Sequence, residues 1–218
     1  MPLSRIPLEP SNTYHIYNRS VGGQNIFCEE KNYPFFLSQL IPRISLFSDV
    51  LAYCLTPNYF HFLIRIKEEK ELVTRWQDKM NLLREKRIKK NSDKTADHFL
   101  LNHLMITEFS NAFNSYVQAY NKIYRRYGSL LKESFQRKIV AGNEDLLKGI
   151  CYMHNYPVSH GFTAEKETWK PSSYLDILNQ QKSFVLVEEV LQLFNGIENF
   201  VHLHNRFPGS GNGFNIVE

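Results

Sequence analysis

The chain has 218 residues, 43% hydrophobic and 14% aromatic, which is enough apolar material for a folded core and excludes a disordered chain. Its formal net charge is +4, and no apolar run reaches the roughly 18 residues of a membrane-spanning helix. The sequence has no signal-peptide pattern and its three cysteines form no C-x-x-C pair, so we expect a cytoplasmic protein with reduced thiols and no membrane partner.

The first third of the chain predicts three strands and one helix. Residues 13–19 alternate and are rich in β-formers, which is typical of a strand. Residues 31–47 have the apolar spacing of a helix, although Pro42 predicts a kink or break there. Residues 50–55 and 59–66 predict two further strands, which a Pro-Asn turn joins into an apolar hairpin.

A charged segment and a second helix follow. Residues 67–102 predict an insertion into the fold, with a helix from 69 to about 90 and then a loose linker. The next helix is amphipathic and ends at Gly128. Its aromatic stripe is expected to belong to the core and not to a base-stacking surface. The stripe consists of Phe109, Phe113, Tyr116, Tyr120, Tyr124 and Tyr127.

The rest of the chain predicts one more strand and three helices. Residues 135–140 predict a fourth strand, and a helix from about 143 to 155 is expected to end before Pro157. Two short amphipathic helices are predicted in the tail, over about 187–196 and 197–204.

The order strand, helix, strand, strand, helix, strand and helix favours the α+β class. We predict a ferredoxin-like antiparallel sheet with helices packed on one face, plus a short helical C-terminal extension. The domain boundaries are predicted at 1–162 for the sheet domain and 163–218 for the extension.

Basic residues are concentrated in the sheet domain. The extension carries four bases and seven acids, so the first 162 residues hold the positive charge. One cluster lies within residues 84–90, and a second contains Lys122, Arg125, Arg126, Lys132, Arg137 and Lys138. Two such clusters that flank an aromatic-rich helix favour a polyanionic partner, whereas one cluster alone is more typical of a solvated helix face.

The apolar hairpin carries one unexpected imidazole, because strands of Phe, Leu and Ile have no packing need for His61. Side chains two positions apart on a strand face the same side, so Tyr59 and His61 can approach one cation. Much later, residues 150–161 place Tyr152 and several polar groups on about one helical turn.

These segments together resemble the single-tyrosine transposases of the HUH superfamily, in the REP-associated branch. The matching segments are Tyr14–Arg19, Ala52–Ile64, Tyr116–Leu131 and Ile150–Gly161, with further similarity at Trp169–Tyr174 and Phe194–His204. The resemblance implies metal-assisted cleavage and rejoining of single-stranded DNA through a 5′-phosphotyrosine intermediate. It also implies a hairpin or single-stranded DNA partner and a homodimer, in which Ala141–Asn143 could serve as the joint for exchange of the tyrosine helix.

The resemblance assigns the site residue by residue. Tyr152 matches the nucleophile, and His61 matches the second histidine of the cation site, which would take Mg²⁺ or Mn²⁺. The first histidine falls on Tyr59, and the third ligand falls on Tyr156. A neutral phenol is a weak ligand, since its pKa lies near 10. The cation is therefore expected to bind weakly or not at all.

Other side chains are candidates for the missing ligands. Asn155 is the first of these, and the others are His154, His15 and Glu133. The position of the family's arginine falls on Ser134, with Arg137 nearby.

Three functions remain open from the sequence. The first is an active transposase, which requires Tyr152 and a divalent cation. The second is a catalytically inactive derivative that binds hairpin or single-stranded DNA, and the phenols at positions 59 and 156 favour it. The third is an RNA-binding sheet, although neither central strand carries the aromatic signature of that class.

Overall fold

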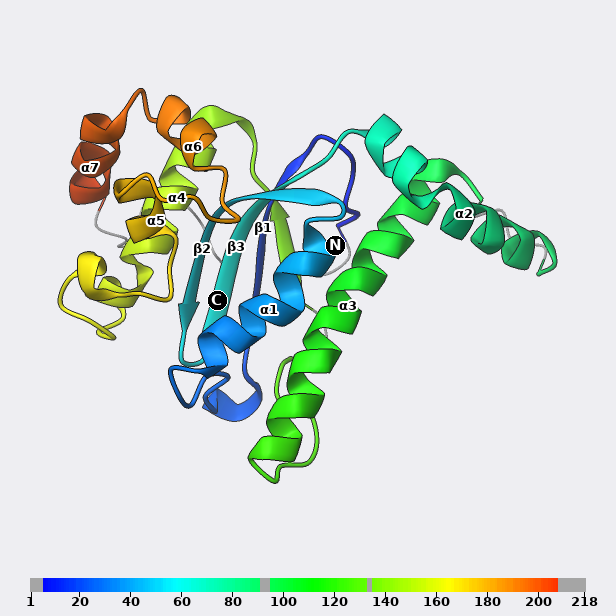
Figure 1. Ribbon diagram of the computed structural model, residues 1–218, viewed down its shortest axis with the longest axis horizontal. Coiled ribbons are helices and arrows are strands. Elements are labelled where there is room, and N and C mark those ends of the chain that lie inside the picture. Colours follow the sequence, from blue (N-terminus) through cyan, green and yellow to red (C-terminus); the bar gives the residue numbers. More distant parts are fainter. Residues whose placement is uncertain (1–5, 91–94, 133–134, 208–218) are drawn as a thin grey trace.

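The computed structural model describes residues 6–90, 95–132 and 135–207 (Figure 1). These residues form a four-stranded antiparallel sheet in the order β2-β3-β1-β4. The strands are β1 (Thr13–Arg19), β2 (Ser48–Thr56), β3 (Tyr59–Ile66) and β4 (Gln136–Ile139). The predicted α+β class and antiparallel sheet are thus confirmed.

The prediction of helices on one face was wrong, because the helices lie on both sides of this sheet (Figure 1). They are α1 (Asn32–Ile44), α2 (Glu69–Ile88), α3 (Asp97–Ile123), α4 (Gly142–Ser159), α5 (Tyr174–Leu178), α6 (Val187–Leu193) and α7 (Ile197–Arg206), with single turns η2 (Val21–Gly23) and η3 (Lys166–Thr168). The expected helices α1 and α3 cross one face, while α4 packs against β2 and β3 on the other. Within the described ranges, no helix has both the length and the apolar character needed to cross a membrane.

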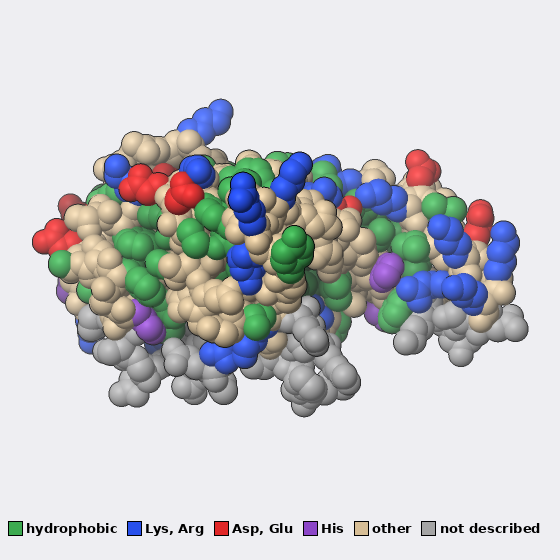
Figure 2. Space-filling model, turned by 90° about the horizontal axis from the view of Figure 1, so that it is seen from below, with side chains coloured by type: hydrophobic (Ala, Val, Ile, Leu, Met, Phe, Trp, Pro, Cys, Tyr) green, Lys and Arg blue, Asp and Glu red, His purple; other side chains and the backbone are tan. Residues whose placement is uncertain are grey.

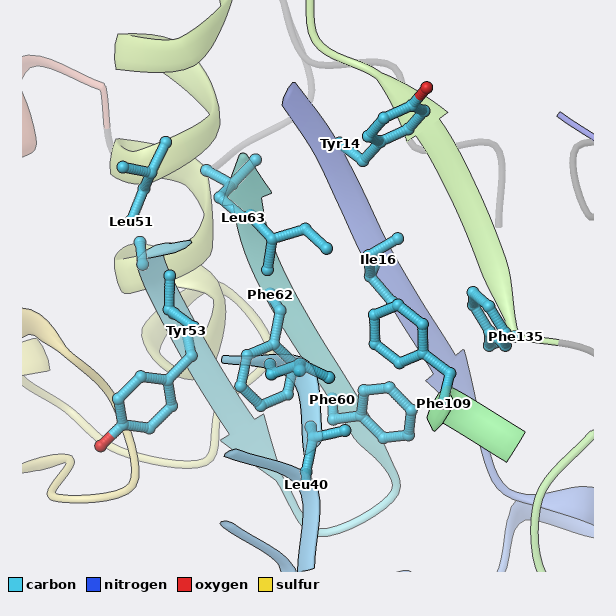
Figure 3. Packing of buried hydrophobic residues seen from close by; sticks show 14 of the residues in the cluster. Tyr14, Ile16, Leu40, Leu51, Tyr53, Phe60, Phe62, Leu63, Phe109 and Phe135 are labelled. Atoms are coloured by element: carbon cyan, nitrogen blue, oxygen red, sulfur yellow. The ribbon is translucent and has the colours of Figure 1, made fainter. Parts of the chain in front are cut away.

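The main core lies between the sheet and the pair α1 and α3 (Figure 3). Alternation along β3 directs Phe60 and Phe62 towards these helices and His61 towards α4. The Phe60 ring lies 5.1 Å from Phe36 of α1 and 5.2 Å from Phe113 of α3, measured between centroids. Burying each such ring stabilises the fold by roughly 1.5–3 kcal/mol. Because the phenylalanines of β3 share one face, that face packs against α1 and α3.

Helix α2 and the first half of α3 form an arm that projects from the body (Figure 1). A buried carboxylate, Glu108 of α3, joins helix α2 of the arm to helix α1 of the body. It accepts from the Arg43 guanidinium of α1 at 3.3 Å and from the Lys79 ammonium of α2 at 3.2 Å. The Trp76 ring also packs 5.7 Å from Phe47. The charged insertion is therefore attached to the body through α2.

The C-terminal segment runs along the outer edge of β2. The backbone N–H of Leu55 donates to Pro171 at 2.8 Å, and that of Leu186 donates to Val50 at 3.0 Å. Between them, the Ser173 N–H donates to the Tyr53 carbonyl at 3.0 Å. The segment covers hydrogen-bonding groups that an edge strand would otherwise expose. The division of the chain at residue 162 stays a prediction.

Several predicted boundaries were wrong. Helix α3 begins at Asp97, inside the predicted insertion over residues 67–102, and residues 91–94 of the predicted linker lie outside the described residues. Pro42 does not end α1, and Pro157 lies inside α4. Both prolines sit in the last turn, where the fixed φ is helical and only one backbone hydrogen bond is lost. A short helix, α5, was not predicted.

Candidate functional site

The face of the sheet opposite the main core carries a row of aromatic rings from β1 and β3. Tyr17 lies opposite His61 in the antiparallel register, so His15, Tyr17, Tyr59 and His61 share this face. Their rings are stacked in sequence. The centroid distances are 4.7 Å from Tyr17 to His15, 5.3 Å from His15 to His61 and 4.9 Å from His61 to Tyr59.

Helix α4 adds two tyrosines to this row. Tyr152 and Tyr156 are one helical turn apart, and their rings are 5.8 Å from each other. The His61 ring lies 6.5 Å from Tyr152 and 4.6 Å from Tyr156. Tyr59 completes the group at 6.0 Å from Tyr156. The structure therefore brings together the four positions that the resemblance assigned to the nucleophile and the cation ligands.

The two histidines in this cluster are fully buried and hydrogen-bonded to each other. His15 Nε2 and His61 Nδ1 are 3.1 Å apart, so one imidazole donates to the other. Burial lowers the pKa of His15 to about 3, with a further contribution from Lys138. Burial likewise holds the pKa of His61 well below its ordinary value, and repulsion from protonated His15 or His160 would act in the same direction. Both rings are neutral near pH 7. The His61 ring has no exposed surface, so it does not face solvent directly.

These residues do not fit a Mg²⁺ or Mn²⁺ site. Such ions prefer several oxygen ligands with open coordination positions. Across the described ranges, no three His, Cys, Asp or Glu side chains are grouped to hold a metal ion. His61 Nδ1 is engaged by His15, and His61 Nε2 has no hydrogen-bond partner in the described part of the chain. The remaining side chains of the cluster are His15, which is engaged with His61, and the phenols of Tyr59 and Tyr156, which are weak ligands for such ions.

The suggested substitute ligands on α4 point elsewhere. The Asn155 amide donates to the carbonyls of His204 and Phe207, both at 2.9 Å. His154 bonds to His204 at 2.9 Å and to the Ser173 hydroxyl at 2.8 Å. The predicted role of Asn155 is therefore corrected: it lies next to Tyr156 in sequence, and about 100° of rotation per residue places it on another side of the helix. Glu133 and Ser134 lie outside the described residues.

The His154 network was not predicted from the sequence. It contains two buried imidazoles, those of His154 and His204, whose rings are stacked at 5.1 Å. Burial lowers the pKa of His204 to about 4 and that of His154 well below its ordinary value. The partner of His154 comes from α7, so no local motif signals the pair. It fastens α4, and with it Tyr152, to the C-terminal helices.

The predicted DNA-binding residues fall in three places. Four of them gather at the C-terminal end of α3 and in the segment after it: Lys122, Arg125, Arg126 and Lys132. Seen from this end, Lys and Arg side chains cluster across the middle of the molecule (Figure 2). Lys138 lies on β4 opposite His15, on the α4 face.

Arg137 faces the other way and is buried. Its Nε donates to the carbonyl of Ile6, its guanidinium lies 5.2 Å from the Phe135 ring, and burial lowers its pKa. On β4, neighbouring residues alternate between faces, so Arg137 and Lys138 cannot share one contact surface. The structure gives Arg137 a packing role.

The aromatic stripe of α3 also needs one correction. Tyr116 and Tyr120 are buried, as expected, whereas Tyr127 is 95% exposed. The helix ends at Ile123, before Tyr127, so the periodicity that placed this ring in the core no longer applies.

Comparisons with known proteins agree with this picture at the level of the fold. The chain matches no family model and no curated protein. Among solved structures, it is similar to that of a REP-associated tyrosine transposase bound to a REP hairpin, with a TM-score of 0.55 and 10% sequence identity. The match covers 83% of this chain and 87% of the other. At this identity, the likeness shows a shared fold.

Proposed function

We propose that this protein binds hairpin or single-stranded DNA and does so without a divalent cation. The observation that carries the binding is the group of exposed cations at the end of α3. Lys122, Arg125 and Lys132 have no ion-pair or hydrogen-bond partner for their charged groups among the described residues. Unpaired cations on one surface bind a phosphate backbone by releasing its counterions. The fold supports this partner, because the similar structure is a transposase bound to a hairpin.

The aromatic cluster favours binding over metal-assisted cleavage. Tyr152 lies beside His61, as a nucleophile of this fold would, but phenols occupy the other two cation positions. Without a cation, the phosphoryl group lacks its main electrophilic partner. His61 is also a poor general base for the Tyr152 hydroxyl, because burial keeps the pKa of its imidazole low.

The sheet does not support the RNA-binding alternative. A sheet that stacks bases must expose its aromatic side chains. Here Tyr17 and His61 are buried on one face, and Phe60 and Phe62 are buried on the other. We therefore propose the end of α3 as the contact surface.

Two measurements test this function. Fluorescence anisotropy with a labelled hairpin oligonucleotide should show binding in EDTA that Mg²⁺ does not strengthen, with affinity falling steeply as salt rises. Replacing Lys122 and Arg125 by Glu should weaken binding, whereas Lys182→Glu, an exposed cation of the C-terminal segment, should have little effect. Salt-independent binding, or no binding, would refute the proposal.

The second measurement separates binding from cleavage. The protein is incubated with the same hairpin carrying a single-stranded flank and Mn²⁺, and then analysed on a denaturing gel. We expect no covalent adduct. An adduct that disappears in Tyr152→Phe would instead establish the transposase activity and overturn the binding-only function.

A further inference from the structure

The Tyr127 ring is held out in solvent at the end of α3. It is 95% exposed, which exceeds the exposed fraction of the other large exposed hydrophobic side chains described. Tyrosine rings ordinarily bury most of their apolar surface, so this exposure has no packing explanation.

The backbone that carries Tyr127 is braced. Asn121 accepts from the Arg126 N–H and guanidinium, each at 2.8 Å, and its amide donates to the Gly128 carbonyl at 2.9 Å. Arg126 also donates to Gln24 and lies 5.9 Å from the Tyr120 ring. These contacts tie the residues on both sides of Tyr127 to the body.

The turn also contains unfavourable backbone geometry. Arg125 has φ +50° and Gly128 has φ +83°. The left-handed region is open to glycine but costs a residue such as arginine on the order of 1 kcal/mol. The bracing contacts maintain this conformation, and its effect is to direct the ring away from the core.

The surroundings of the ring are positively charged. Three exposed cations, Lys122, Arg125 and Lys132, lie within five positions of Tyr127 in the sequence. Their charge favours a polyanionic partner. The nearby acid Glu29 is already engaged, by Lys31 at 2.8 Å and by the Tyr124 hydroxyl at 2.6 Å. An exposed ring among cations matches the design of single-strand binding surfaces, where bases stack on aromatic rings and cations contact the phosphates.

We propose that Tyr127 stacks on an unpaired base of the bound DNA, with Lys122, Arg125 and Lys132 on the neighbouring phosphates. The inference rests on the proposed function and deepens it, because it assigns the contact to unpaired nucleotides. Bases within a duplex are already stacked on their neighbours, so a protruding ring gains most from a base in a loop or a single-stranded flank. Tyr127 is thus assigned as the residue that distinguishes such DNA from a blunt duplex.

The test compares two labelled probes. One is a hairpin with a single-stranded tail of about four nucleotides that contains the fluorescent base 2-aminopurine. The other is a blunt duplex with the same number of phosphates. Tyr127→Ala should bind the tailed hairpin roughly 5- to 150-fold more weakly and lose the quenching of 2-aminopurine, while its affinity for the duplex stays unchanged. Tyr127→Trp should retain both affinity and quenching.

The controls separate this inference from the function on which it rests. Ile88→Ala removes another exposed apolar side chain, which is 63% exposed and lies at the end of α2, and should alter neither probe. If the unmodified protein binds neither probe, the proposed function fails. If it binds the hairpin and Tyr127→Ala binds equally well with the same quenching, the stacking role alone is overturned. An equal loss on both probes would also overturn it.

Discussion

The four buried histidines predict that the protein unfolds in mild acid. They form two hydrogen-bonded pairs, His15 with His61 and His154 with His204, and all are at most 1% exposed. Burial lowers the pKa of each, to about 3 for His15 and about 4 for His204. Nearby Lys138 and Lys166 act in the same direction.

The direction of the pH effect follows from these shifts. In the unfolded chain each imidazole titrates near pH 6.5, whereas in the fold it stays neutral to much lower pH. The unfolded state therefore takes up protons first, and stability is lost as the pH falls below about 6.5. One proton changes the free energy of unfolding by about 1.36 kcal/mol per pH unit, so four give a limiting slope of about 5 kcal/mol per unit. By pH 5 the loss is a large part of the stability of a typical domain, which is roughly 5–15 kcal/mol.

Urea unfolding between pH 8 and pH 4.5 measures this slope directly. We expect a nearly flat region above pH 7 and a steep fall between pH 6 and pH 5. His154→Gln should reduce the slope by about a quarter, because it removes one of the four protons. His202→Gln, at an exposed position of α7, leaves the buried imidazoles in place and serves as the matched control. A slope below about 1 kcal/mol per pH unit between pH 6 and pH 5 would refute the neutral, buried state of these histidines.

Three further predictions concern individual side chains. The double change Tyr59→His with Tyr156→Asn supplies imidazole and amide ligands beside His61, so calorimetry should detect Mn²⁺ binding that the unmodified protein lacks; no added heat would contradict the assignment of the site. Ser173→Ala removes the hydrogen-bond partner of the Tyr53 N–H and of His154 Nε2 and should lower the free energy of unfolding by about 1–3 kcal/mol; an unchanged urea midpoint would argue against that network. Glu108→Ala should lower it by about 1 kcal/mol, since the two cations it joins are partly solvated, and the exposed Glu85→Ala should have no effect in the same assay.

Local patterns predicted the sheet well. The bounds of β1 and β3 match the expected strands, because alternation and β-branched or aromatic content are read within a few residues. The approach of His61 to Tyr152 was available only through the resemblance, since nothing local relates two such distant positions. The prolines were misleading for a physical reason: the cost of Pro42 or Pro157 depends on its place within the helix, and the sequence does not fix where the last turn ends.

Long-range partners set the limits of the prediction. Asn155 was expected beside the cation site, but its amide binds carbonyls at the end of α7, which the sequence does not place. The exposure of Tyr127 also depended on a local event, the end of α3 at Ile123, which the continuing aromatic spacing conceals. Periodicity predicts a face only as far as the helix continues.

The strip of C-terminal backbone along β2 has a consequence for biosynthesis. Translation proceeds from the N-terminus, so the hairpin of β2 and β3 leaves the ribosome long before Pro171 and Leu186 can reach it. Until then, the apolar edge from Val50 to Leu55 is available to any other nascent strand. Premature termination or proteolytic loss of the C-terminal segment would leave the outer edge of β2 uncovered. We expect such a truncated protein to self-associate through β2.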